Sequence, residues 1–135
     1  MDKAGILFPM VALAALTFSV LILVGVRRFR AGFARRVHYD DFMLGESARV
    51  PADVMLPNRN MMNLLEMPVL FYVACLAYYV AAQVDGVALA LAWSYLALRI
   101  VHSGIHLSYN KVRHRLVAFA ASNVALWAYL LQSLA

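Results

Sequence analysis

Four apolar stretches run through this sequence, each close in length to a helix that crosses a membrane. Such a helix needs about 20 residues to cross roughly 30 Å of hydrocarbon. Because 64% of the residues are hydrophobic and only 14% are charged, the chain has too little polar surface to cover a soluble domain of its length. We therefore predict a multi-pass integral membrane protein with spans at about 5–26, 58–82, 87–109 and 114–134.

The pattern within these stretches indicates helices rather than strands. A membrane β-barrel would show alternating segments of about ten residues, whereas the run from Val11 to Val26 is apolar on every side. The connections at Gln83–Gly86 and Lys111–Arg115 are so short that the helices they join must be antiparallel neighbours. The expected fold is an all-α four-helix membrane bundle, a single domain over residues 1–135.

The basic residues are grouped by membrane side. The net charge is +5, but ten of the twelve Lys and Arg residues lie between Arg27 and Arg59 or between Lys111 and Arg115, and the turn at Asp85 has none. Topology explains this grouping better than nucleic-acid binding does, because cytosolic loops collect Lys and Arg. Both basic connections are therefore expected to face the cytosol. The membrane would be the inner membrane in a bacterium or the endoplasmic reticulum in a eukaryote.

The longest connection runs from Arg27 to Pro57. Pro51 and Pro57 argue against an unbroken helix through it, so we expect a cytosolic loop with a short surface helix. The apolar stretch before it is expected to be retained rather than cleaved as a signal peptide, because Arg27 and Arg28 stand where small residues should precede a cleavage site.

Two polar clusters interrupt the apolar spans, where ionisable groups are costly and usually functional. In the second span, Arg59, Asn63 and Glu66 have the i, i+4, i+7 spacing that places them on one helix face. On the third helix, seven polar residues fall within a stripe about 120° wide when plotted at 100° per residue. They are Arg99, His102, Ser103, His106, Tyr109, Asn110 and Arg113.

These clusters permit more than one interpretation. A structural ion pair between Glu66 and Arg99 would hold the bundle together. A basic pocket lined by Arg59, His106, Arg113 and Arg115 would instead suit a carboxylate ligand. A metal site at Glu66, His102 and His106 lacks a third His or Cys, so the sequence predicts no metal ligands. The aromatic residues Trp93, Trp127, Tyr78, Tyr79 and Tyr129 are expected mainly at the interface or against lipid.

The second-span pattern Arg59-x-x-x-Asn63-x-x-Glu66, followed by Pro68 and Phe71-Tyr72, resembles the second-helix signature of the MAPEG family. This family comprises membrane-associated proteins in eicosanoid and glutathione metabolism. The segment with Arg99-x-x-His102-Ser103, followed by Lys111 and Arg115, is similar to the Arg, His, Thr and arginine pattern of prostaglandin E synthase. The chain thus resembles a family member of the microsomal glutathione transferase or prostaglandin E synthase type. The resemblance covers nearly the whole chain and implies a homotrimer that binds glutathione between subunits, near the cytosolic face.

Carried over residue by residue, the resemblance implies a set of functional positions. Arg115 would stabilise the glutathione thiolate, and His106 stands where the eicosanoid enzymes place a tyrosine near the sulfur. Arg28 or Arg30 would clamp glutathione from the adjacent subunit. The candidate glutathione-binding residues are Arg28, Arg30, Arg59, Asn63, Glu66, Arg99, His102 and Tyr109, and the candidate catalytic residues are Arg115 and His106.

The departures from the family pattern narrow the expected activity. His106 replaces that tyrosine, and Leu116 replaces the serine that follows the thiolate arginine in prostaglandin E synthase. We therefore expect a glutathione-dependent transferase or peroxidase acting on a lipophilic electrophile from the bilayer, rather than an eicosanoid synthase. The alternatives are a non-catalytic trimer that binds an anionic ligand or uses its polar face structurally, and a proton- or metal-coupled bundle.

Overall fold

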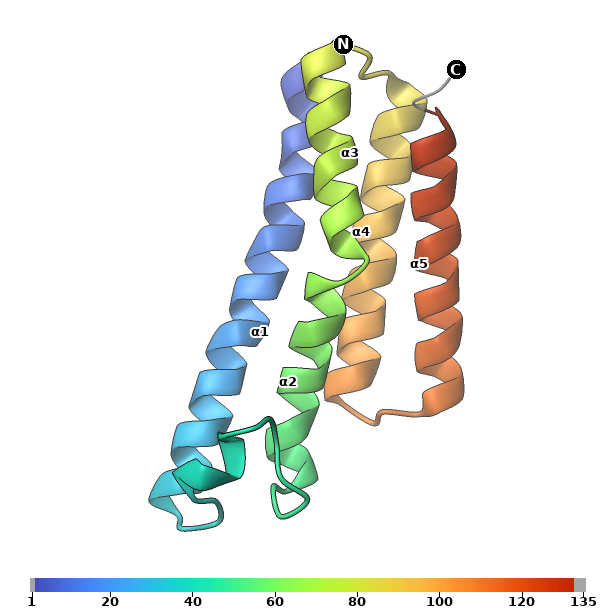
Figure 1. The fold of residues 1–135 in the computed structure, drawn as a ribbon. Coiled ribbons are helices and arrows are strands. Elements are labelled where there is room, and N and C mark those ends of the chain that lie inside the picture. The colour runs from blue at the N-terminus through green and yellow to red at the C-terminus, as the bar shows by residue number, and fades with distance from the viewer. Residues whose placement is uncertain (1, 133–135) are drawn as a thin grey trace.

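The computed structural model describes residues 2–132, which form an all-α bundle (Figure 1). The chain runs down the bundle in α1, back up through α2 and α3, down in α4 and up in α5 (Figure 1). The elements are η1 (Lys3–Ile6), α1 (Leu7–Phe33), η2 (Tyr39–Phe42), α2 (Ala52–Leu65), α3 (Pro68–Ala81), α4 (Gly86–Leu107) and α5 (Val112–Gln132). Both basic connections lie at one end of the bundle, as the charge pattern predicted, and α1 begins and α5 ends at the other (Figure 1).

The second span is two helices rather than one, which corrects the expectation of a single helix over 58–82. Glu66 leaves the helical region, with φ −90° and ψ −103°, and Pro68 begins α3 in a first-turn position where its missing N–H costs little. The connection from Arg27 to Pro57 is not one unbroken helix, as predicted, and the prolines differ in their places: Pro51 is the N-cap of α2, whereas Pro57 lies inside it. Pro57 is the sixth residue of α2, so its missing N–H removes only one early intrahelical bond.

Within the described residues, three helical segments are long and apolar enough to cross a membrane: Lys3–Phe33, Ala52–Ala81 and Gly86–Leu107. The fourth expected span corresponds to α5, whose mean hydropathy is too low for it to count among these segments. The last residues predicted for this span lie outside the described residues. It carries Arg113, His114 and Arg115 in its first turns and Ser122 and Asn123 further along. α5 nevertheless packs along the whole of α4 as an antiparallel neighbour (Figure 1).

Aromatic side chains fill the core between α3, α4 and α5. Phe71 lies 4.7 Å from Tyr95 between ring centroids, and Tyr78 stacks on Tyr129 at the same distance. The Tyr78 hydroxyl donates a 2.9 Å hydrogen bond to the Tyr129 backbone carbonyl, and the Tyr129 hydroxyl donates to Cys75 Sγ. The expectation that Tyr78 and Tyr129 face lipid or the interface was therefore wrong, because paired hydroxyls let both rings be buried.

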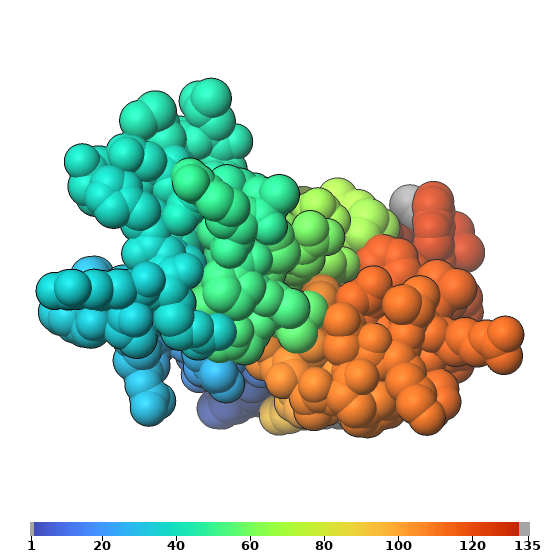
Figure 2. All heavy atoms as spheres, turned by 90° about the horizontal axis from the view of Figure 1, so that it is seen from below, coloured from blue at the N-terminus to red at the C-terminus, as the bar shows by residue number. Residues whose placement is uncertain are grey.

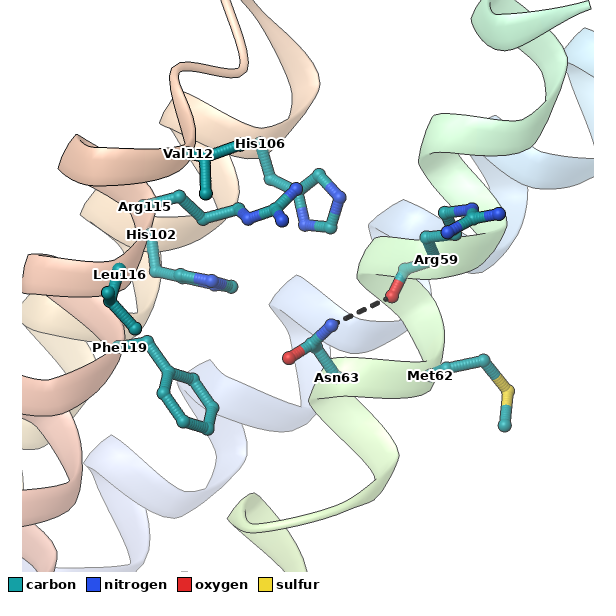
Figure 3. A pocket seen from close by; sticks show the side chains of 9 residues that line it. All are labelled: Arg59, Met62, Asn63, His102, His106, Val112, Arg115, Leu116 and Phe119. Carbon is teal, nitrogen blue, oxygen red and sulfur yellow. Dashed lines mark hydrogen bonds between the residues drawn. The ribbon is translucent and has the colours of Figure 1, made fainter.

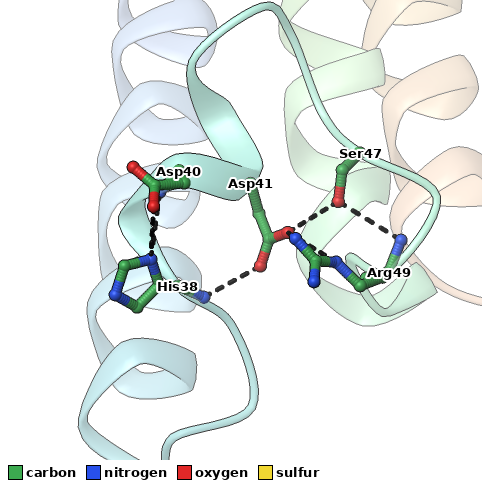
Figure 4. A network of polar contacts seen from close by, with 5 residues as sticks. All are labelled: His38, Asp40, Asp41, Ser47 and Arg49. Atoms are coloured by element: carbon green, nitrogen blue, oxygen red, sulfur yellow. Dashed lines mark hydrogen bonds and ion pairs between the residues drawn. The ribbon is translucent and has the colours of Figure 1, made fainter.

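The connection between α1 and α2 is a folded loop built around Asp41 (Figure 4). The Asp41 carboxylate accepts hydrogen bonds from the His38 backbone N–H at 2.9 Å, the Ser47 hydroxyl at 2.8 Å and the Arg49 guanidinium. These donors, with the positive charge of Arg49, hold the pKa of Asp41 below its usual value. The short helix η2 within this loop matches the surface helix that the sequence predicted.

Candidate functional site

A pocket of about 410 Å³ opens between α2 on one side and α4 and α5 on the other, toward the basic end of the bundle (Figure 3). This volume lies within the range of small-molecule sites. The lining residues are Arg59, Met62 and Asn63 from α2, His102 and His106 from α4, and Val112, Arg115, Leu116 and Phe119 from α5. The sequence-predicted residues Arg59, Asn63, His102, His106 and Arg115 therefore come together in one place.

The α2 wall is polar because Arg59 and Asn63 are one helical turn apart and share a face. The Asn63 side-chain amide donates a 3.1 Å hydrogen bond to the Arg59 backbone carbonyl, which fixes the amide group. Its oxygen is left pointing into the pocket as an acceptor (Figure 3). Next to this wall, the Ser103 hydroxyl donates to the buried Asn60 side-chain oxygen at 3.2 Å and ties α4 to α2.

The α4 wall consists of two buried imidazoles, His102 and His106, with ring centroids 5.7 Å apart. Within residues 2–132, neither ring nitrogen of His106 has a hydrogen-bond partner, and the same holds for Nδ1 of His102. Buried polar atoms are nearly always hydrogen-bonded, so unpartnered nitrogens on a pocket wall suit a polar ligand. Both rings project from α4 into the space between α5 and α2 (Figure 3).

The α5 wall begins at the helix N-terminus and turns apolar as it rises. Arg115 is in the first turn, and its guanidinium donates a 2.8 Å hydrogen bond to the Asn110 side-chain oxygen. Asn110 has a left-handed backbone with φ 47°, which asparagine tolerates better than most residues. The helix N-terminus adds its positive potential to that of the guanidinium.

Sequence reasoning missed the apolar part of this wall. Val112, Leu116 and Phe119 line the pocket beside Arg115, and Met62 lines it from α2. The four α5 residues follow an i, i+3, i+4, i+7 pattern, which places them on one face of the helix. This shared helix face with Arg115 was the signal available in the sequence. A Leu or Phe in an apolar helix, however, can line a pocket or contact lipid, and the residue type does not distinguish the two.

Arg99 and Glu66 do not form the ion pair considered from the sequence. Arg99 is completely buried, and its guanidinium donates a 2.9 Å hydrogen bond to the Asn63 backbone carbonyl at the end of α2. Glu66 is exposed and has no ion-pair partner within residues 2–132. The physical reason is the helix break, because a residue outside the helical region no longer shares the face of Arg59 and Asn63.

Four other predicted residues lie outside the pocket. Tyr109 is 55% exposed and its hydroxyl is hydrogen-bonded to His114 Nδ1 at 3.0 Å, and Arg113 is exposed. Arg28 pairs with Glu46 at 3.1 Å near the end of α1, and Arg30 is exposed on another face of the same helix. The expected role of Arg28 or Arg30 in a neighbouring subunit's glutathione site stays a prediction.

The charged residues that line the pocket are Arg59 and Arg115, so its potential is positive. This donor set suits a ligand with carboxylates, since guanidinium groups bind carboxylates through charge-assisted hydrogen bonds. Among residues 2–132, no group of three or more His, Cys, Asp or Glu side chains is placed to hold a metal ion.

The sequence model of the MAPEG family matches residues 6–135. The chain therefore belongs to the MAPEG family, whose members are integral membrane bundles and include glutathione-dependent transferases and peroxidases. Searches of curated proteins and of solved structures found no match.

Proposed function

We propose that this protein is a glutathione-dependent membrane transferase or peroxidase that acts on lipophilic electrophiles. The observation that carries the proposal is the pocket in which Arg59, His106 and Arg115, from three different helices, surround one cavity. A pocket with two guanidinium groups, two imidazoles and one apolar wall suits a ligand that is anionic at one end and reacts with an apolar partner at the other.

The fit to glutathione rests on the groups that line the pocket. Glutathione carries two carboxylates, an ammonium group, amides and a thiol. Arg59 supplies a cation for a carboxylate, and the fixed Asn63 oxygen supplies an acceptor for an N–H group. The unpartnered nitrogens of His102 and His106 supply further polar contacts. Glutathione, when bound, supplies the nucleophilic or reducing thiol.

Arg115 is the residue that we assign to thiolate stabilisation. A free thiol ionises with a pKa of about 8.5, and a nearby fixed cation or helix N-terminus favours the ionised form. Arg115 combines both features, because it lies in the first turn of α5 and lines the pocket. Its hydrogen bond to Asn110 holds the guanidinium in place before any ligand arrives, which lowers the cost of ordering it.

We assign to His106 the role of accepting the proton that leaves the glutathione thiol. Both of its ring nitrogens lack a partner among the described residues, so a neutral imidazole there is free to accept a proton at one nitrogen. This assignment gives His106 a chemical role that differs from the tyrosine hydroxyl of the eicosanoid enzymes. The apolar wall of Val112, Leu116 and Phe119 would contact the lipophilic substrate and exclude water beside the sulfur.

The assembly we propose is a homotrimer in which a neighbouring subunit completes the site. Arg28 and Arg30 lie at the same end of the bundle as the pocket but on α1, away from its lining. Only the α1 of another subunit would bring one of them to the ligand. Light scattering of detergent-purified protein should give the mass of three chains, whereas a monomer that still binds glutathione would contradict a shared site.

The first test is calorimetric titration of the detergent-purified protein with glutathione. Binding at micromolar to millimolar concentrations, together with weaker binding of a glutathione dimethyl ester, supports a carboxylate-binding pocket. Equal binding of the ester, or no binding of glutathione, contradicts it. If glutathione binds but no aryl halide is conjugated and no hydroperoxide is reduced, the non-catalytic alternative replaces the enzyme.

A further inference from the structure

The helix α1 is longer than the hydrocarbon layer that it crosses. Its 27 residues span about 40 Å at 1.5 Å per residue, against roughly 30 Å of hydrocarbon. The excess lies at the basic end, because the charged residues of α1 begin only at Arg27. The last two turns, Arg27 to Phe33, therefore lie at the depth of the lipid headgroups.

These last two turns present an apolar face and a cationic flank at one depth. Phe29 and Phe33 are 71% and 88% exposed, and they continue the exposed stripe of Phe18, Ile22 and Val26 along α1. Arg30 lies beside that stripe, and Arg27, one turn earlier, lies further round the helix toward the opposite face. An aromatic and cationic belt of this kind is typical of the interface between hydrocarbon and headgroups.

The cationic flank forms a notch of about 310 Å³ against the start of α2. Arg27, Arg30 and Arg36 line it with Asp53, over a floor of Ala31 and Ala34. Arg36 is held by Asp53 through two hydrogen bonds of 2.7 and 3.0 Å, whereas Arg27 and Arg30 have no ion-pair partner within residues 2–132. Three arginines against one aspartate leave the notch with two uncompensated positive charges.

The apolar face borders a second hollow, of about 610 Å³, between the end of α1 and η2 (Figure 2). Phe29, Phe33, Tyr39 and Phe42 line it together with Gly32, Val37, His38 and Arg28. The Asp41 network and the Arg28–Glu46 ion pair hold the loop against α1. The α1 residues that line this hollow alternate with those that line the notch, so the two lie on opposite faces of the helix and are separate.

We propose that the end of α1 binds an anionic phospholipid of the cytosolic leaflet, with the lipid phosphate in the notch of Arg27, Arg30 and Arg36. Charge complementarity carries the choice of occupant, since a zwitterionic lipid would leave the two positive charges partly uncompensated. This site is separate from the proposed glutathione pocket. It assigns Arg30 to the lipid, so a contact with a neighbouring subunit's glutathione would fall to Arg28, which would exchange its Glu46 partner for the ligand.

The test uses the purified protein in nanodiscs that contain a trace of a phospholipid with a photoreactive group on its acyl chain. Two probes are compared, phosphatidylglycerol and phosphatidylcholine, and mass spectrometry locates the cross-links. We expect the phosphatidylglycerol probe to label peptides within residues 27–42 several-fold more than the phosphatidylcholine probe. Removing both unpaired charges in Arg27→Gln with Arg30→Gln should lower that labelling by roughly an order of magnitude.

The matched control is Lys111→Gln with Arg113→Gln, which removes the same charge from the other basic connection. It should leave labelling of residues 27–42 unchanged. Equal labelling by both probes, or an equal loss in the control, would overturn the proposal. Cross-links between subunits at Phe29 or Phe33 in place of lipid would show that a second copy of the chain covers the face. Loss of labelling on addition of millimolar inorganic phosphate would show a site for free anions.

Discussion

The Arg99 guanidinium donates its 2.9 Å hydrogen bond to the backbone carbonyl of Asn63, and so joins α4 to the broken end of α2. The carbonyls at a helix C-terminus carry a partial negative charge and lack intrahelical partners. Pro68 has no N–H for the Leu64 carbonyl four residues before it, and the chain has already left the helical region at Glu66, so the last carbonyls of α2 need partners from outside the helix. A buried cation at this point compensates them, and it also places Asn63 against the pocket.

Glu66 and Arg99 should therefore couple only weakly, because charge attraction links them without a contact. In a double-mutant cycle of Glu66→Gln and Arg99→Met, the changes in unfolding free energy should add within about 0.5 kcal/mol. Glu66→Gln alone should change stability by no more than about 0.5 kcal/mol, as for other exposed sites. Denaturant unfolding in detergent measures both quantities. A coupling energy above about 1 kcal/mol would restore the ion pair.

The helix break also separates the features of the fold that the sequence predicted from those that it did not. The apolar lengths and the short turn at Asp85 predicted an antiparallel helical bundle, because chain length and hydropathy fix both features locally. The break at Glu66 was not predicted, since a proline four or more residues into an apparently continuous span is compatible with a kink, a new helix or neither. The direction in which the Glu66 side chain points depends on this break.

The pocket residues likewise include some that the sequence predicted and some that it did not. A basic pocket of Arg59, His106, Arg113 and Arg115 was predicted because charged residues at membrane depth are rare enough to stand out. The family resemblance added Asn63 and His102, and of all these residues the structure places only Arg113 outside the pocket. The pocket's Leu116 and Phe119 were not predicted, since their residue types are the common ones in any membrane helix. Tyr78 and Tyr129 were misplaced because tyrosine suits both an interface and a hydrogen-bonded core, and the partner that decides between them is remote in sequence.

The hydrogen bond from Tyr78 to the Tyr129 carbonyl should contribute measurably to bundle stability. Tyr78→Phe keeps the stacked ring but leaves a buried carbonyl short of its donor, and we expect a loss of about 1 kcal/mol. Tyr79→Phe is the matched control, since its ring is only half-buried and its hydroxyl has no hydrogen bond among the described residues. Thermal melts in detergent compare the two. Equal melting temperatures would show that the Tyr78 bond contributes nothing.

Acid should loosen the loop between α1 and α2. The pKa of Asp41 is lowered in the folded loop, and an unfolded aspartate titrates near about 3.9. The stabilisation is therefore complete above about pH 5 and is lost as pH falls through the folded pKa. Hydrogen exchange of residues 38–49, corrected for intrinsic rates, should rise in acid. Asp41→Asn should exchange faster at neutral pH and lose this dependence; an unchanged dependence would assign it to another group.

Arg59 should control the affinity for glutathione. Arg59→Ala removes a charge-assisted hydrogen bond to a carboxylate, which should weaken binding by roughly ten- to a hundredfold in calorimetric titration. Arg113→Ala is the control, because Arg113 is a nearby exposed cation that does not line the pocket. If Arg113→Ala weakens binding as much, the effect comes from the general positive potential rather than from the pocket.

The central claim is that Arg115 stabilises a glutathione thiolate, and ultraviolet difference absorbance of bound glutathione tests it most directly. The wild-type protein should show thiolate absorbance near neutral pH, where free glutathione is mostly thiol. Arg115→Leu should abolish that absorbance and the conjugation of an aryl halide while weakening glutathione binding only modestly, and Arg115→Lys should retain part of both. Glutathione bound by the wild type without thiolate absorbance, or full turnover in Arg115→Leu, would contradict the account.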